Sequence, residues 1–176
     1  PATMPSPRLP RIGLQVSGEA ASLTDAEARR LAPLKLDHVR VDLDPTAPTF
    51  GARLQSAADQ AATLQTSLHV GLHMSAESDI SLDALMNALG DCPVSPSVVL
   101  CLAATADQYR QTRSRILSEA PRTLVARGYD TNFVDLNRDR PEPGSVDGVT
   151  WAINPQIHAF DNASIVESLP IHTTTL

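Results

Sequence analysis

Six short apolar segments recur along the chain at near-regular intervals, and this recurrence limits the fold more than any other feature. The stretches between the first five have helical spacing, and two begin with capping boxes, Thr24 with Glu27 and Thr105 with Gln108. Strands that alternate with helices predict a parallel sheet. The predicted strands are residues 11–16, 38–44, 67–74, 97–103, 123–129 and 148–154, and helical spacing also follows Pro48 and Ser81.

The polarity of the strand faces distinguishes two parallel-sheet architectures. Because successive side chains of a strand point to opposite faces, Arg40 and Asp42 lie opposite an apolar face, and so do His69 and His73. A doubly wound sheet carries helices on both faces and is apolar throughout, whereas a barrel opens into a polar cavity at the carboxyl ends of its strands. The sequence therefore predicts an α/β, TIM-barrel-like (β/α) fold, with an open doubly wound parallel sheet as the alternative.

The chain length limits how much of a barrel is present. A complete (β/α)₈ barrel takes about 250 residues, whereas this chain has 176 and shows six clear strands, with a seventh in its terminal segment "IHTTTL". We therefore expect an incomplete barrel of six to seven βα units over residues 11–176, after a Pro-rich leader over residues 1–10. The chain is expected to be a fragment of a longer multidomain protein, in which flanking domains or self-association cover the open barrel edge.

Composition excludes several classes of partner. A net charge of −6 without a basic stripe argues against nucleic acid, and no apolar run reaches the roughly 18 residues of a membrane helix. With no export signal in view, we expect a cytoplasmic protein. Cys92 and Cys101 lack CxxC spacing and are expected to be free thiols. No strand precedes a phosphate-binding glycine motif, and the sequence predicts no cofactor.

Two polar stretches follow the fifth and sixth predicted strands. The first, "YDTNFVDLNRDRP", covers residues 129–141, and the second, "INPQIHAFDN", covers residues 153–162. A purely structural interpretation of the first is a helical turn capped by Asp130 or Thr131, with arginines paired to neighbouring acids. Two adjacent strand ends with carboxylate, amide, imidazole and guanidinium groups instead favour one wall of a pocket.

Three motifs in order carry a resemblance to a known family. They are "PRIGLQVSGEAASLTDAEARRLAPLKLDHVRVDLD", "TNFVDLNRDRP" and "INPQIHAFDNASIVESL". Together they resemble the central barrel domain of the D-apionate lactonase family over residues 10–170. The resemblance implies hydrolysis of a sugar-acid lactone, D-apionolactone to D-apionate, in the bacterial catabolism of apiose. The barrel is also similar to those of retaining glycoside hydrolases.

Residue roles follow from the chemistry of lactone opening, which needs an activated water, oxyanion stabilisation and a proton for the leaving alkoxide. Asp135 or Glu19 is predicted as the base and His158 as acid or base. Glu19 as a solvent-facing loop acid and His158 as a turn cap are the structural alternatives. The predicted substrate contacts are Gln15, Asp42, His73, Asn137, Arg138 and Asn154.

Arg40 and Asp42, two apart on one strand, are expected to form an ion pair on the cavity floor. No metal site is predicted, because His69 and His73 lie roughly 13 Å apart along one strand and cannot share an ion. A site built across strands from His73, Asp42 or Asp44 and His158 is a weaker option.

Two alternatives to a lactonase stay open. A glycoside hydrolase would need a carboxylate pair such as Asp42 and Asp135. A barrel piece without catalysis would bind a sugar or act as a scaffold. Serine chemistry has little support because no GxSxG turn occurs, and Cys101 is expected in the core.

Overall fold

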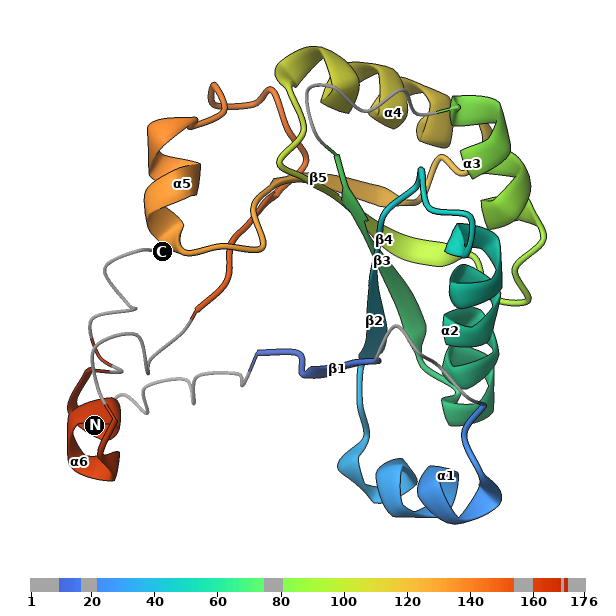
Figure 1. Ribbon diagram of the computed structural model, residues 1–176, viewed down its shortest axis with the longest axis vertical. Coiled ribbons are helices and arrows are strands. Elements are labelled where there is room, and N and C mark those ends of the chain that lie inside the picture. Colours follow the sequence, from blue (N-terminus) through green and yellow to red (C-terminus); the bar gives the residue numbers. More distant parts are fainter. Residues whose placement is uncertain (1–9, 17–21, 75–80, 154–159, 169, 171–176) are drawn as a thin grey trace, which may run out of the picture.

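The computed structural model describes residues 10–16, 22–74, 81–153, 160–168 and 170 (Figure 1). Six parallel strands form one curled sheet, and their order in the sheet is their order in the chain. A doubly wound sheet would reverse its strand order at a switch point, so that alternative is wrong. The prediction of an incomplete TIM-barrel-like fold is confirmed. The strands are β1 (Gly13–Gln15), β2 (His38–Leu43), β3 (Ser67–His73), β4 (Pro96–Leu102), β5 (Leu124–Gly128) and β6 (Val149–Thr150).

Four helices follow the first, second, third and fourth strands in turn. They are α1 (Asp25–Leu31), α2 (Phe50–Leu64), α3 (Leu82–Gly90) and α4 (Ala106–Glu119), with a short 3₁₀ turn, η1 (Ala32–Leu34), after α1. Helices α2, α3 and α4 lie along the convex side of the sheet, and α1 lies below it in the view (Figure 1). Two shorter helices, α5 (Phe133–Arg138) and α6 (Asn162–Ser168), follow β5 and β6. In Figure 1, α5 lies to the left of the sheet, whereas α2 and α3 lie to the right.

The hydrophobic core lies between the convex face of the sheet and helices α2, α3 and α4. The alternate residues Val39, Val41 and Leu43 of β2 are buried there, as are Leu68, Val70 and Leu72 of β3. Helix α2 contributes Leu54, Ala57, Ala58 and Ala61, whose spacing places them on one stripe of the helix. Burial of each Val or Leu contributes about 1.5 to 3 kcal/mol to the stability of the fold. This layer therefore fixes which face of each strand packs on the helices and which face lines the concave side.

The helix starts confirm the local sequence signals. Both capping boxes form, so that the Thr24 and Thr105 side chains accept from the backbone N–H groups of Glu27 and Gln108. Ser81 caps α3 in the same way through Ala84 N–H. The cap of α5 differs from the expectation: Asn132, not Asp130 or Thr131, accepts from Val134 N–H. The reason is that the side chains of Asp130 and Thr131 contact other residues.

The concave face of the sheet is divided into two halves. On β2 and β3 it presents Arg40, Asp42, His69 and His73, as the alternation of the sequence predicts. On β4 and β5 it is apolar, with Val98, Leu100, Leu102 and Ala126 in one cluster. The interior of this half-barrel is therefore polar on one side only.

Some expectations concern residues outside the described ranges. The terminal segment with the expected seventh strand and nearly all of the leader are among them, so the domain boundaries stay a prediction. Strand β6 is shorter than the predicted segment 148–154. Among the described residues, no helix combines the length and apolar character that crossing a membrane requires. The cytoplasmic location also stays a prediction.

Candidate active site at the carboxyl ends of the strands

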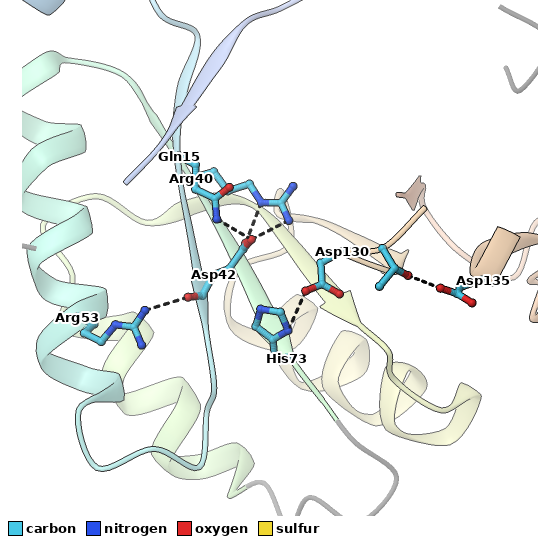
Figure 2. A network of polar contacts seen from close by, with 8 residues as sticks. Gln15, Arg40, Asp42, Arg53, His73, Asp130 and Asp135 are labelled. Carbon is cyan, nitrogen blue, oxygen red and sulfur yellow. Dashed lines mark hydrogen bonds and ion pairs between the residues drawn. The ribbon is translucent and has the colours of Figure 1, made fainter. Parts of the chain in front are cut away.

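Three side chains from β1 and β2 meet on the polar half of the concave face (Figure 2). The Arg40 guanidinium donates to both oxygens of Asp42, from Nε at 2.8 Å and from Nη2 at 3.0 Å. The Gln15 amide donates to Asp42 Oδ2 at 3.0 Å, because the register pairs Gln15 with Arg40. The expected Arg40–Asp42 ion pair is therefore confirmed, and it is partly buried, with 12% of the Asp42 side chain exposed.

Asp42 is also fixed from its two neighbouring elements. Its backbone carbonyl accepts from Arg53 Nη2 of α2 at 3.3 Å. Its carboxylate leans across β3 over Gly71, its register partner. A side chain at position 71 would collide with that carboxylate, so the glycine leaves the space that Asp42 occupies.

A histidine and an aspartate meet at the carboxyl ends of β3 and β5. His73 is the last residue of β3, and Asp130 follows β5. His73 Nδ1 lies 3.6 Å from Asp130 Oδ2, with 42% and 44% of the two side chains exposed. That separation is longer than a good hydrogen bond, and such contacts in enzymes commonly tighten when substrate binds. Figure 2 shows the pair beside the Asp42 group, with the ring of His73 directed toward Asp130.

The predicted residues of α5 contact one another and their close neighbours in the chain. Asp135 accepts from Thr131 Oγ1 at 2.6 Å and from Arg138 Nη1 at 3.5 Å. Asn137 accepts from Arg140 Nη2. The side chain of Arg138 is largely exposed, and Asp135 stands apart from Asp42 in Figure 2. The structure therefore brings Gln15, Asp42 and His73 to one face, and it places the α5 residues to the side.

Three predicted site residues, Glu19, Asn154 and His158, lie outside the described residues. Their roles stay predictions. In the second polar stretch, Asp161 is described, and its carboxylate accepts from the Ser164 N–H and hydroxyl at the start of α6.

Two residues of this site were missed as functional candidates in the sequence. Asp130 belongs to the polar stretch predicted as a pocket wall, but the sequence does not single it out as a site residue, although the carboxyl ends of barrel strands are where catalytic groups commonly lie. The alternation of β3 places Gly71 on the same face as His69 and His73 and predicts no role for it. Its signal is a glycine inside a strand, which often marks a close approach of another group.

A second set of contacts holds the connection after β5. Arg127 donates from Nε to the carbonyl of Ala104 at 2.9 Å and from Nη2 to Asp139 at 2.5 Å. The Tyr129 hydroxyl donates to the same Asp139 oxygen at 2.8 Å. Burial, and next its bond to Asp139, raises the pKa of Tyr129. These contacts fix the segment that carries Asp130.

Neither cysteine is suited to nucleophilic chemistry. Both are free, and Cys101 is fully buried on the convex face. Burial raises the pKa of Cys101 to about 12 and also raises the pKa of Cys92. Because the thiolate is the reactive form, both thiols are expected to be inert, as the sequence predicts for Cys101.

A cavity of about 170 Å³ lies elsewhere, between α3 and α4 at the start of β4. Its lining includes Met86, Leu89, Val99 and Ile116, and it holds none of the polar groups described above. We place the candidate site on the concave face because the chemistry gathers there.

Comparison with known proteins gives one assignment. None of the curated proteins compared with the chain matches it. A family model described as the TIM barrel domain of D-apionate lactonase matches residues 12–176, which is nearly the whole chain. The curled sheet of six parallel strands with alternating helices is consistent with an incomplete TIM barrel. The chain therefore belongs to the D-apionate lactonase family, and the match is to the TIM barrel domain of that family.

Proposed function

We propose that this domain carries hydrolysis of the lactone of D-apionate, with His73 as the general base and Asp130 as its positioning partner. The family name is that of a lactone hydrolase. The observation that carries the proposal is the His73–Asp130 contact, because it lies at the carboxyl ends of the strands, where barrel enzymes hold their catalytic groups. The family resemblance also implies that this reaction belongs to the catabolism of apiose.

The geometry supplies a route for the proton. Asp130 faces Nδ1 of His73, which leaves Nε2 for a water molecule. His73 removes a proton from that water as it attacks the lactone carbonyl, and a tetrahedral intermediate forms. The intermediate collapses with cleavage of the bond to the ring oxygen, which receives the proton from the imidazolium. Asp130 stabilises the imidazolium while the proton is held.

The polar half of the concave face supports substrate binding in this proposal. The oxygens of Asp42 and the amide of Gln15 offer acceptors and a donor to the hydroxyl groups of a sugar acid. Asp42 of β2 and His73 of β3 lie on the same face of the sheet. Asp42 pairs with Gly71 of β3, and His73 lies two residues further along that strand, about 7 Å away. Asn137, Arg138 and Asn154 stay predicted contacts, and Asp135, Glu19 and His158 stay predicted acid or base groups.

A glycosidase is less well supported. That chemistry needs one carboxylate free to protonate the leaving group and another free to attack or activate water. Asp42 is bound by Arg40 and Gln15, and Asp135 is bound by Thr131 and Arg138.

The expected partners of the chain also stay a prediction. Flanking domains or a second copy of the chain are expected to cover the open edges of the sheet.

The experiment is lactone hydrolysis followed by pH-stat with D-apionolactone and with a simple aldonolactone. We expect turnover of D-apionolactone, and a fall in kcat of about 10²-fold or more in His73→Gln, because a general base contributes about 10² to 10⁴. Asp107→Asn, an exposed change on α4, is the control and should leave kcat unchanged. Folded protein that opens neither lactone would support the non-catalytic alternative, and cleavage of nitrophenyl glycosides would support the glycosidase.

A further inference from the structure

A second cluster of chemically active side chains lies at the opposite ends of the strands. Asp37 precedes β2, His38 begins it, and His69 lies near the start of β3. Each offers one ligand atom, and the three atoms lie within 4.8 Å of one another. We call these three residues the basal cluster. Nothing in the proposed hydrolysis uses it.

The separation within the first pair matches metal coordination. His38 Nδ1 lies 3.3 Å from Asp37 Oδ2. In a tetrahedral zinc site with ligands about 2.0 to 2.1 Å from the metal, two ligand atoms lie about 3.3 to 3.4 Å apart. The same distance is long for a hydrogen bond between an imidazole and a carboxylate, which prefers about 2.7 to 2.9 Å. The separation therefore matches two ligands of one tetrahedral metal ion as well as a long hydrogen bond.

His69 supplies the third ligand from the neighbouring strand. Its ring stacks on His38 with centroids 3.7 Å apart and an interplanar angle of 10°. A ring nitrogen of His69 is one of the three ligand atoms that lie within 4.8 Å of one another. Since lone pairs lie in the ring planes, His69 must tilt out of the stack to complete the site.

The backbone holds the cluster in place. Asp37 N–H donates to the carbonyl of Ile12 at 2.8 Å, and the Asp37 carbonyl accepts from Ser67 N–H at 3.1 Å. His38 lies against Gly13, where an added Cβ would be 2.0 Å from Nε2. Gly13 therefore leaves space for the ring on β1. The ligands are tied to three consecutive strands before any ion binds.

Two cations face the basal cluster. Arg11 Nε lies 4.0 Å from Asp37 Oδ1, but 83% of the Arg11 side chain is exposed, so it can turn to solvent. The Arg40 guanidinium, on the register partner of His69, is held by both oxygens of Asp42. Loss of the exposed Arg11 contact costs little, because exposed ion pairs stabilise proteins only weakly.

We propose that Asp37, His38 and His69 bind one Zn²⁺, or a similar divalent transition metal, with water as the fourth ligand. Two imidazoles and one carboxylate are ligands that zinc prefers. The amino ends of barrel strands are associated with stability rather than catalysis. The ion therefore acts as a structural clasp that joins β2 to β3 and, through Asp37, to the edge strand β1.

The test is zinc binding to untagged protein, measured by isothermal titration calorimetry and by Tm in Zn²⁺ against EDTA. We expect one Zn²⁺ per chain and, at about 100 times Kd, a Tm rise of about 5 °C or more. His69→Ala and Asp37→Asn should each weaken binding by more than about 100-fold, since even outer-shell changes cost 10- to 100-fold. His73→Ala, a change on the same strand at its other end, should bind zinc like the wild type.

Several outcomes would overturn the proposal. If zinc neither binds nor raises Tm, there is no clasp. If binding is lost in His73→Ala and kept in His69→Ala, the metal lies at the carboxyl ends instead. Circular dichroism of each variant in EDTA separates loss of a ligand from loss of folding. The Co²⁺ form gives a second readout, because visible absorption of a tetrahedral site should appear in the wild type and be absent in His38→Ala.

Discussion

The Asp42 carboxylate occupies the space that a side chain at position 71 would need. A Cβ on Gly71 would lie 2.1 Å from Asp42 Oδ1 and 3.1 Å from the Leu102 Cδ1 atom. Asp42 has little freedom to move away, because Arg40 and Gln15 hold both of its oxygens. The polar group on β1 and β2 therefore depends on the absence of a side chain on β3.

This relationship predicts the effect of Gly71→Ala. The added methyl group forces the Asp42 carboxylate out of its contacts, and overpacking of this kind costs about 1 to 3 kcal/mol. The measurement is the free energy of unfolding by urea. Gly51→Ala is the control, because that glycine lies on α2 with open space around it, and alanine there should be neutral or stabilising by up to about 1 kcal/mol. Equal stability of the two variants would contradict the prediction.

The two carboxylates beside the α5 connection are expected to differ in function. Asp130→Asn should lower kcat about 10²-fold or more with KM little changed, because the amide no longer stabilises the imidazolium of His73. Asp135→Asn should instead affect the local contacts with Thr131 and Arg138. The measurement is steady-state lactone hydrolysis by both folded variants. A larger loss in Asp135→Asn would restore Asp135 as the predicted base.

The Arg113–Asp147 pair predicts a pH dependence of stability. Its two bonds from Nε and one from Nη2 of Arg113 lower the pKa of Asp147. A carboxyl whose pKa is lower in the folded protein contributes stability above its ordinary value of about 3.9, and this contribution is lost as the pH falls through the folded pKa. Asp147→Asn should therefore lower Tm at neutral pH, and the difference from wild type should shrink below pH 4 or so.

The control for this pair is Asp107→Asn, which removes an exposed contact with Arg110 within α4. Exposed pairs contribute little, so Tm should hardly change at any pH. A difference for Asp147→Asn that grows on acidification would have the wrong sign and would contradict the assignment.

Thiol reactivity is expected to follow burial. Cys101 is fully buried, which raises its pKa to about 12, whereas Cys92 is half-buried, and burial raises its pKa also. In native protein, a thiol reagent at pH 8 should label Cys92 slowly and Cys101 only after unfolding in urea. Mass spectrometry after timed labelling measures both rates. Rapid labelling of Cys101 in the native protein would show that the core layer opens easily.

The elements that sequence reasoning located are those set by local chemistry. A capping box is complete within four residues, so Thr105 and Gln108 mark the start of α4 without reference to the rest of the chain. The alternation of polar and apolar residues on β2 likewise fixes its two faces. The bounds of α2 follow from the spacing of its apolar residues, which begins at Phe50 and ends at Leu64.

The features that sequence reasoning missed depend on contacts between strands. The contact between His73 and Asp130 joins β3 to the end of β5, and no spacing along the chain records it. The proximity of His38 to His69 depends on the β2–β3 register in the same way. The strand β4 is apolar on both faces, so alternation alone does not reveal that Leu100 and Leu102 lie on the concave side.

The division of the concave face has a consequence for any molecule that enters it. Hydroxyl-binding groups gather along β1 to β3, and hydrocarbon covers β4 and β5. A sugar ring also has two unlike sides, one richer in C–H groups and one richer in hydroxyls. A ring that entered this face would therefore lie with its C–H side on β4 and β5 and its hydroxyl side on β1 to β3. The contrast between the two walls would orient such a ligand before any single hydrogen bond forms.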